Sequence, residues 1–456
     1  MKKSLLITIC MAFLFPAISQ NMEGSWYGTL NAGMLKLRIV LNITAEENGY
    51  SATMDSPDQG AKGIKITDIR YVQPKLTFNI QNAIEYEGLY ANDTIAGTFN
   101  QNGMDFPLVF SRGTVEPTST TRPQDPKPPF PYHTESIQFK NKEAGITLAG
   151  TFTRPQEGHD FPVAILVSGS GPQNRDEEIL NHRPFLVLSD YLTRNGIAVL
   201  RYDDRGVGDS EGDYKTASLY DFTSDAKAAL DYLKTRKDID TKKMGVIGHS
   251  EGGTIALLLA SEPQNDLSYI VSMAGMVMRG DSLLKIQRYL LSSKQGVSDQ
   301  DIAKNEELIN IINNVIKQHP EDYILQNIEH ITDECLPDSL RNEESIRKVF
   351  QQGVKQLMTP ELKSLMAWDP SEILSKIQCN VLAIGGDKDL QVPVTLNLNL
   401  LQSQVKKRVT TKIYPNLNHL FQHCTTGLPN EYAGINETIS PEVLNDIATW
   451  IIHNNK

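Results

Sequence analysis

The feature that most constrains the fold is a repeated alternation between apolar, strand-like runs and helical stretches, which begins near Glu135. The runs "VAILVSGSG", "IAVLRYDDRG" and "KMGVIGHS" each lead into a glycine-containing turn and are separated by segments of helical periodicity. Strands that are apolar throughout need cover on both faces, and the connecting helices supply it. The pattern therefore predicts an α/β unit over residues 135–456, with a mostly parallel sheet whose ligands bind at the carboxyl ends of the strands.

A different pattern occupies residues 24–112. In "MLKLRIVLNI" the residues Leu37, Ile39 and Leu41 face one way and Arg38 and Asn42 the other, as in a half-buried strand. Similar short runs follow, separated by turn signals such as Asn102-Gly103. We expect a small antiparallel meander, either a barrel or a sandwich. Its aromatic residues are expected to form core rather than a ligand platform: Trp26, Tyr27, Phe78 and Phe99.

The segment between these units, residues 113–134, is rich in proline and small polar residues, which favours an extended linker. Within the α/β unit, residues 277–374 are almost entirely helical in pattern before a strand returns at "NVLAIGGDKD". An insertion at that point is predicted to lie over the strand ends as a lid.

The N-terminus places two lysines before an apolar run that ends near the small residues Ala17 and Ser19. This arrangement predicts a cleaved signal peptide over residues 1–19 and hence an exported protein, periplasmic or secreted. The run is shorter than the roughly 20 residues that span a bilayer, so we expect no stable membrane insertion. The net charge of −11, without a basic stripe, argues against nucleic acid as a partner.

Ser250 stands at the turn of "GHSEGG", between an apolar strand and an apolar helix. Glycines flank it at Gly248 and Gly252, as a strand-to-helix turn too tight for side chains requires. The helix that begins at Glu251 directs its N–H groups and its positive dipole end toward an anion beside it. Ser250 is therefore a candidate nucleophile, and the alternative is a small residue in a tight turn.

A serine nucleophile needs a base, and the base needs an acid that fixes its orientation. Asp387 and Asp389 follow the strand-like "VLAIGG", and His419 follows "VTTKIYP". The order Ser, Asp, His is that of the α/β-hydrolases.

Together with "RYDDRGVGDSEG", "GGDKDLQVP" and "LNHLFQ", these motifs make residues 135–456 resemble the serine-aminopeptidase-like branch of the α/β-hydrolases, which includes monoglyceride lipases and small bacterial carboxylesterases. The resemblance implies Ser250 as nucleophile, His419 as base and Asp389 as acid. Asp389 is preferred because it fits the spacing G-x-x-D-x-x-V-P, and Asp387 is the fallback acid.

Such an enzyme also needs two backbone N–H groups that hold the negative charge developing on the substrate oxygen. We expect them from Glu251, directly after the nucleophile, and from Ser170 in "VSGSGPQNRD", with Gly171 as the next choice. Many members of the branch carry His-Gly where this chain has Ser168-Gly169, a departure that affects loop packing rather than backbone donors.

The resulting expectation is an exported carboxylesterase that acts on a small-molecule ester through an acyl-enzyme, with no metal or other cofactor. A peptidase on the same triad is one alternative, although Glu251 replaces the tryptophan that follows the serine in proline iminopeptidases. The other alternative is a protein whose N-terminal β domain binds a glycan or lipid, with the hydrolase unit secondary.

Other polar residues receive structural interpretations. Asp203, Asp204 and Arg205 are expected to form a salt-bridged turn, with bordering the substrate pocket as the alternative. Arg175 and Asp176 are expected in loop ion pairs, with substrate contact as the alternative. A metal site at His419, His423 and Cys424 is disfavoured because no third acidic or histidine ligand lies nearby in sequence.

Overall fold

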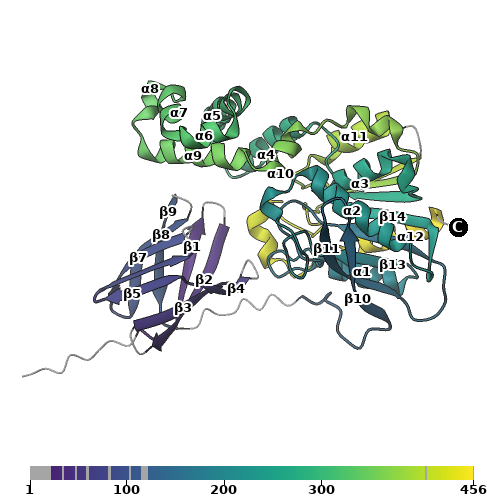
Figure 1. The fold of residues 1–456 in the computed structure, drawn as a ribbon, viewed down its shortest axis with the longest axis horizontal. Helices are drawn as coiled ribbons and strands as arrows, with labels where there is room; N and C mark the ends of the chain where they lie inside the picture. Colours follow the sequence, from purple (N-terminus) through teal and green to yellow (C-terminus); the bar gives the residue numbers. More distant parts are fainter. Residues whose placement is uncertain are drawn as a thin grey trace, which may run out of the picture.

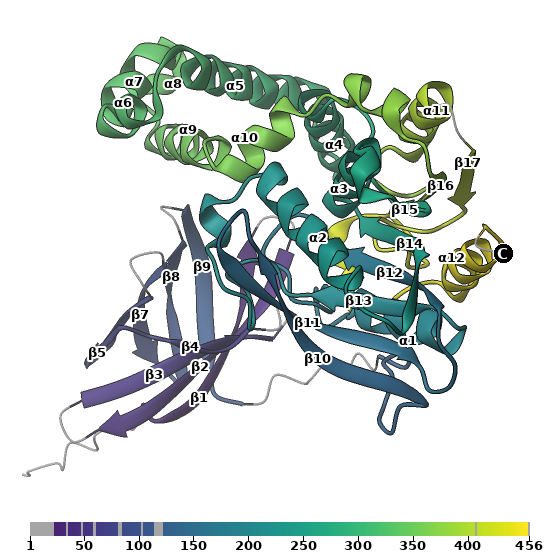
Figure 2. The ribbon, with the colours of Figure 1, turned by 45° about the vertical axis from the view of Figure 1, so that its right-hand side comes forward.

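The computed structural model describes residues 22–32, 35–46, 49–57, 61–80, 84–101, 104–113, 122–405 and 408–454. The predicted signal peptide, residues 1–19, lies outside these ranges. Figures 1 and 2 show an N-terminal β domain, an α/β domain and a group of helices that extends sideways from the latter.

The described part of the N-terminal region forms one nine-stranded antiparallel sheet, curved into a half-barrel, with the order β4-β3-β2-β1-β9-β8-β7-β6-β5. The meander prediction is confirmed, as one curved sheet rather than a two-sheet sandwich. The strands are β1 (Gly24–Ala32), β2 (Leu35–Glu46), β3 (Gly49–Ser56), β4 (Ala61–Lys65), β5 (Asp68–Val72), β6 (Lys75–Ile80), β7 (Ile84–Ala91), β8 (Thr94–Gln101) and β9 (Met104–Ser111).

Alternation along β2 builds the interior of this half-barrel. Leu37, Ile39 and Leu41 are buried, because successive side chains of a strand point to opposite faces and these share the concave one. Trp26, Phe78 and Phe99 are buried in the same core, as expected, whereas Tyr27 is half-buried and lies outside it.

The described residues from Tyr132 onward form an eight-stranded sheet with the order β10-β11-β13-β12-β14-β15-β16-β17. The first two strands are antiparallel to their neighbours and the remaining pairs are parallel. The strands are β10 (Tyr132–Asn141), β11 (Ile146–Pro155), β12 (Phe161–Val167), β13 (Ala198–Tyr202), β14 (Ile239–His249), β15 (Tyr269–Met273), β16 (Asn380–Gly386) and β17 (Val409–Tyr414).

Helices cover both faces of this sheet, which confirms the predicted α/β-hydrolase fold. One core cluster unites the sheet with α2 (Leu219–Leu233), α3 (Glu251–Ser261) and α11 (Val394–Gln404). A second cluster, on the opposite face, contains α1 (Pro184–Arg194) and α12 (Pro441–Asn454). The central strands β12, β13, β15 and β16 are buried along nearly their whole length, as strands covered on both faces are.

The insertion between β15 and β16 is helical, as predicted, but most of it lies away from the sheet. Its helices are α4 (Gly280–Lys294), α5 (Asp299–Gln318), α6 (Glu321–Gln326), α7 (Ile328–Cys335), α8 (Asp338–Arg341), α9 (Glu344–Leu357) and α10 (Pro360–Ala367). Of these α-helices, α4 and α10 contribute buried residues, Leu283 and Leu365, to the core of the α/β domain.

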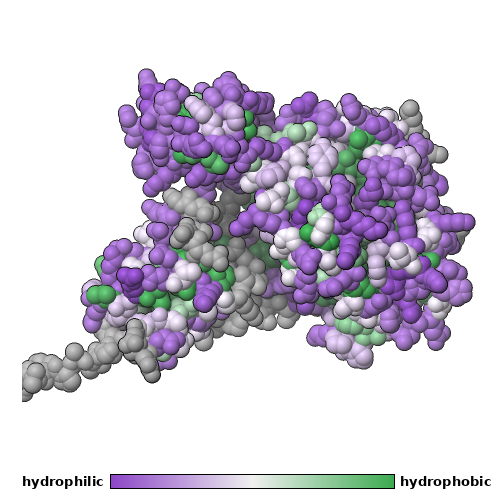
Figure 3. All heavy atoms as spheres, viewed as in Figure 1, coloured by the Kyte–Doolittle hydropathy of each residue, from purple (hydrophilic) through white to green (hydrophobic). Residues whose placement is uncertain are grey.

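The outer helices α5–α9 have a separate small core around Phe350 and extend beyond the sheet on the side of the β domain. In the face drawn in Figure 3, hydrophilic residues cover most of this outer group. None of the helices in the described ranges is long and apolar enough to cross a membrane.

The second half of the linker is anchored to the α/β domain. The Arg122 guanidinium donates to the carbonyl oxygens of Leu180, Asn181, Ala433 and Ile435, at 2.6–3.3 Å. A bond of 3.0 Å from the Asn181 side chain to the Pro57 carbonyl oxygen also joins the α/β domain to the β domain.

Candidate active site

Ser250 lies where β14 turns into α3, in a backbone conformation with φ 53° and ψ −117°. A left-handed φ at a non-glycine residue costs roughly 1–3 kcal/mol. Glycine is required beside it, because a Cβ on Gly248 would lie 1.9 Å from the Gly252 carbonyl oxygen and one on Gly252 would lie 2.0 Å from the Val167 carbonyl oxygen. The turn is therefore a strained, tightly packed elbow.

The Ser250 hydroxyl does not cap the helix that follows it. The hydroxyl makes no hydrogen bond to any residue that the structure describes. No structural contact of the hydroxyl therefore explains why this position is a serine. A strained serine without a capping role is typical of a nucleophile and unusual for a turn residue.

Asp389 and His419 meet at the carboxyl edge of the sheet. The Asp389 Oδ2 atom lies 2.8 Å from His419 Nδ1, with the two side chains 0% and 6% exposed. Asp389 Oδ1 accepts from the backbone N–H groups of Gln391 and Val392, at 2.8 and 2.9 Å. These donors satisfy a buried carboxylate and leave its other oxygen to orient the imidazole.

The loop that carries His419 is folded by its neighbour Asn418. The Asn418 Oδ1 atom accepts from the backbone N–H groups of Leu420 and Gln422, each at 3.0 Å. Phe421 takes a φ of 60° in the same turn and packs into the core. The position of His419 after β17 is therefore set by local hydrogen bonds as well as by the strand.

The fallback acid, Asp387, does not contact His419. Its Oδ1 atom accepts from the backbone N–H of Asn416 at 2.6 Å, and its side chain is exposed. Asp387 thus fixes the turn after β17, while Asp389 faces the histidine.

The loop after β12 lies beside the nucleophile, because a Cβ on Gly169 would sit 3.2 Å from the Ser250 Cβ. The Gly169 N–H donates to Glu177 Oε1 at 2.9 Å, and the Gly171 N–H donates to the Tyr214 hydroxyl at 2.8 Å. The Ser170 N–H between them has no partner among the described residues. This favours Ser170 over Gly171 as a free backbone donor.

A second carboxylate–histidine pair, Glu177 and His249, adjoins the first and was not singled out from the sequence. Glu177 Oε1 lies 2.9 Å from His249 Nδ1, and His249 Nε2 donates to the His419 carbonyl oxygen at 3.0 Å. The rings of His249 and His419 are 4.9 Å apart between centroids. The only sequence signal was the position of His249 directly before Ser250.

The ionisation of His249 follows from these contacts. Burial acts to lower the pKa of His249, but the charge and hydrogen bond of Glu177, together with the His419 carbonyl, outweigh burial and raise that pKa. Because both ring nitrogens face acceptors, the imidazolium form satisfies both.

The acidic turn after β13 is largely structural. Arg175 pairs with Asp203, and Asp176 pairs with Arg201. Arg205 binds Asp225 with Nε–Oδ2 at 2.7 Å. The alternative of substrate contact therefore has no support for Arg175, Asp176 or Asp203.

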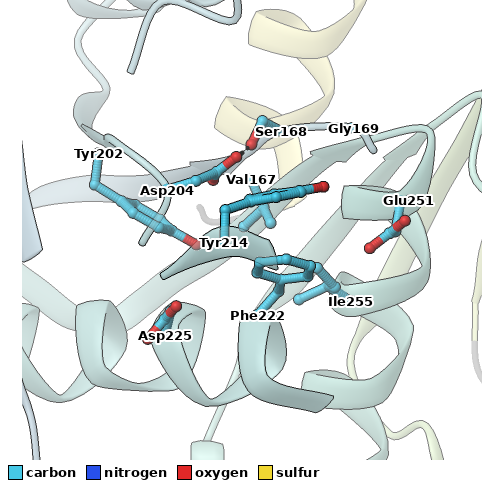
Figure 4. A pocket seen from close by; sticks show the side chains of 10 residues that line it. All are labelled: Val167, Ser168, Gly169, Tyr202, Asp204, Tyr214, Phe222, Asp225, Glu251 and Ile255. Atoms are coloured by element: carbon cyan, nitrogen blue, oxygen red, sulfur yellow. Dashed lines mark hydrogen bonds between the residues drawn. The ribbon is translucent and has the colours of Figure 1, made fainter. Parts of the chain in front are cut away.

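Asp204 differs, because it borders a small cavity behind the loop after β12 (Figure 4). It accepts from Ser168 Oγ at 3.0 Å and from the Gln173 N–H at 2.9 Å. The cavity, of about 10 Å³, has room for roughly one water molecule. Burial raises the pKa of Asp204 to about 8.

The Glu251 side chain lines the same cavity and is 5% exposed. Its Oε2 atom is buried without a hydrogen-bond partner in the described part of the chain. Burial, with the nearby charges of Glu361 and Asp204, raises the pKa of Glu251 to about 8. The Glu251 carboxyl group therefore holds its proton more tightly than an exposed one does, and the Glu251 backbone N–H begins α3 beside Ser250.

No group of three or more His, Cys, Asp and Glu side chains in the described ranges is arranged to hold a metal ion. His423 Nδ1 lies 2.8 Å from Glu437 Oε2, and Cys424 contacts the Asn416 carbonyl oxygen.

The chain matches a known protein family. Residues 184–423, just over half of the 456-residue chain, match the family described as Serine aminopeptidase, S33 (Hydrolase_4). Ser250, Asp389 and His419 all fall within the match.

Two curated relatives differ in how much of their length is matched. Esterase EstD of Thermotoga maritima is 24% identical over 329 residues, 71% of this chain and 70% of that protein. An acyl transferase of Shewanella woodyi is 31% identical over 150 residues, which cover 33% of this chain and less than half, 46%, of that protein. Among solved structures, the α/β hydrolase GrgF of Penicillium matches 71% of this chain and 99% of its own with a TM-score of 0.44 at 15% identity.

Proposed function

This chain belongs to the serine aminopeptidase S33 family of α/β-hydrolases, and on that premise we propose that it is a carboxylesterase with Ser250, His419 and Asp389 as its catalytic triad. The similarity to an esterase along 71% of the chain supports ester hydrolysis as the reaction. The single observation that carries the triad is the buried contact of 2.8 Å between Asp389 and His419, beside the strained Ser250 elbow.

In the proposed reaction, His419 Nε2 removes the proton from Ser250 Oγ as the oxygen attacks the ester carbonyl carbon. Asp389 holds the Nδ1–H of His419, which keeps Nε2 available and stabilises the imidazolium that forms. The backbone N–H groups of Ser170 and Glu251 bind the oxyanion of the tetrahedral intermediate.

The intermediate then collapses. The C–O bond to the alcohol breaks, and His419 returns its proton to the leaving alkoxide, which leaves an acyl group on Ser250. Water, deprotonated by His419, attacks this acyl-enzyme, releases the carboxylic acid and restores the serine. These steps involve only residues of the chain, substrate and water.

The test is Ser250→Ala and His419→Ala, assayed with p-nitrophenyl butyrate. We expect each to lower kcat by about 10³-fold or more, as loss of a nucleophile or its base does in serine hydrolases. Circular dichroism and a thermal melt check the fold, and a fluorophosphonate probe should label the unmodified protein but not Ser250→Ala. Turnover that persists in both folded variants would refute the proposal.

The family name makes amide cleavage the competing reaction, so the same preparation should be assayed on aminoacyl p-nitroanilides. We expect kcat/KM for esters to exceed that for anilides, because the buried Glu251 side chain lines the small cavity and offers no exposed carboxylate to a substrate ammonium. A preference for anilides that carry a free amino group would overturn the assignment as an esterase. The proposed catalytic triad would be unaffected by that result.

We also propose that the protein is exported, on the basis of the lysines, apolar run and small residues before Gln20. Mass spectrometry of the mature N-terminus in a Gram-negative host tests it. Removal of residues 1–19 supports export, and an intact N-terminus in the cytoplasmic fraction contradicts it.

A further inference from the structure

The loop after β12 contains the Ser170 N–H that the proposed reaction requires, and acidic and phenolic side chains anchor this loop on both sides of Ser170. Glu177 accepts from the Gly169 N–H on one side of Ser170. Asp204 accepts from the Gln173 N–H and the Ser168 hydroxyl. Both acids belong to the α/β domain, so these two anchors are independent of the helical insertion.

The third anchor is different because it reaches into the insertion. The Gly171 N–H, one residue after Ser170, donates to the Tyr214 hydroxyl at 2.8 Å and lies 3.2 Å from Glu361 Oε1. The Tyr214 hydroxyl in turn donates to the same Glu361 oxygen at 2.6 Å. Tyr214 comes from the turn η2 (Tyr214–Thr216) before α2, and Glu361 from the first turn of α10.

Gly171 can take this position because it adopts a φ of 91°, which side-chain-bearing residues rarely adopt. Figure 4 shows the Tyr214 hydroxyl directed toward the side of the cavity where Gly169 and Glu251 lie. The phenol is half-buried, and burial with the hydrogen bond to Glu361 raises the pKa of Tyr214. It therefore stays protonated and serves as acceptor and donor at once.

The helix that carries Glu361 is fixed at a second point on the α/β domain. The Leu219 N–H, at the start of α2, donates to Ser364 Oγ at 2.9 Å. At its far end, the Trp368 carbonyl oxygen accepts from the Gly280 N–H of α4 at 3.0 Å. Hydrogen bonds thus connect α10 to α4 and to the start of α2, and Glu361 connects α10 to the loop.

We propose that Glu361 and Tyr214 are positioning residues that hold the Ser170 N–H in place, so that the helical insertion, through α10, sets the geometry of the oxyanion hole. This inference rests on the proposed function. Neither residue touches substrate; each acts through the Gly171 backbone. An insertion displaced from the sheet would leave the triad and the anchors at Glu177 and Asp204 intact, but it would loosen one of the two oxyanion donors.

The experiment compares Glu361→Ala, Glu361→Gln and Tyr214→Phe with the full-length enzyme on p-nitrophenyl butyrate. Loss of a whole oxyanion donor costs about 10²–10³ in kcat, so loosening one should cost on the order of tenfold. We expect this loss in kcat, with KM within twofold, for Glu361→Ala. Glu361→Gln retains an acceptor oxygen and should recover most of the activity.

Fluorophosphonate labelling supplies a readout that a purely structural role would not change. Its rate depends on the same oxyanion donors and should fall in parallel with kcat, while the melting temperature changes little. Tyr214→Phe combined with Glu361→Ala should lose less than the product of the single losses, because both act on one N–H.

The matched control is Glu321→Ala. Glu321 forms an ion pair of 2.9 Å with Lys363, which lies on α10 like Glu361, and this pair does not contact the loop. It should keep kcat within twofold. Folded Glu361→Ala and Tyr214→Phe with unchanged kcat and labelling rate would overturn this inference and leave the proposed function standing. Turnover in Ser250→Ala would instead refute the proposed function itself.

Discussion

Two buried carboxylate–histidine pairs lie side by side in this protein, and only one of them is suited to catalysis. Asp389–His419 and Glu177–His249 have nearly equal contact distances, 2.8 and 2.9 Å, and all four side chains are less than a tenth exposed. The difference lies at the other ring nitrogen. His249 Nε2 donates to a carbonyl oxygen, whereas His419 Nε2 has no partner among the described residues.

This difference decides the role of each histidine. A histidine whose two nitrogens both face acceptors holds its protons and acts as a fixed cross-link, whereas one with a free Nε2 can accept a proton. The bond from His249 to the His419 carbonyl oxygen also means that the Glu177–His249 pair supports the Asp389–His419 pair. Residue type and carboxylate contact alone therefore do not identify a catalytic base.

The largest effect is expected at Asp389, the acid of the proposed catalytic pair. Asp389→Asn should lower kcat by roughly 10³–10⁴-fold, because an amide in place of the carboxylate stabilises the wrong tautomer of His419. Asp387→Asn keeps an oxygen that accepts from Asn416 and should leave kcat within about threefold. Steady-state kinetics of the two variants on one ester measures both values of kcat. Equal losses in the two variants would show that Asp389 is not the acid that orients His419.

An intermediate effect is expected at His249. His249→Gln preserves a donor near the Nε2 position, toward the His419 carbonyl, whereas His249→Asn preserves one near Nδ1, toward Glu177. We expect His249→Asn to lower kcat by about 10–100-fold and His249→Gln by clearly less, with little change in KM. The reverse order would mean that the bond to Glu177, rather than the support of His419, is what catalysis needs.

The smallest effect on activity is expected at Glu251, a buried carboxyl group that is not paired with a histidine in the described part of the chain. Its raised pKa, about 8 against 4.5, means that the folded state keeps a proton that the unfolded chain loses. The contribution of this group to stability is therefore fully present below pH 4.5 and is lost as pH rises toward 8.

Glu251→Gln imitates the neutral acid and should unfold at a higher temperature than the unmodified protein at pH 8, with the difference shrinking toward pH 5. Each unit of pKa shift corresponds to about 1.4 kcal/mol of this difference. The oxyanion N–H is unchanged, so kcat should stay within about threefold. A melting-temperature difference that is independent of pH would contradict a protonated Glu251.

The sequence predicted the fold well where its patterns were regular. The apolar runs of β12 to β16 and the alternation along β2 specified buried and half-buried strands, because burial depends on local periodicity. It did not predict that α5–α9 would form a separate cluster around Phe350 beyond the sheet. The apolar face of an amphipathic helix shows that the helix packs against something, but not against which surface.

In the site, the motifs around Ser250, Asp389 and His419 were visible because each follows a strand. Glu177, Tyr214 and Glu361 were not, because their roles arise from contacts with the backbone N–H groups of Gly169 and Gly171. A backbone N–H has no sequence signature, so its acceptor cannot be inferred from residue types.

The anchoring of Arg122 has a practical consequence for dividing the protein. Its guanidinium binds four carbonyl oxygens of two loops, around Leu180 and Ala433, that meet beside the site, and the Gln124 side chain adds bonds to Thr438 and Ile439. Burial lowers the pKa of Arg122. A hydrolase unit separated from the β domain should therefore begin upstream of Arg122, since a chain that starts at Glu135 would lack the side chains that donate to those carbonyl oxygens.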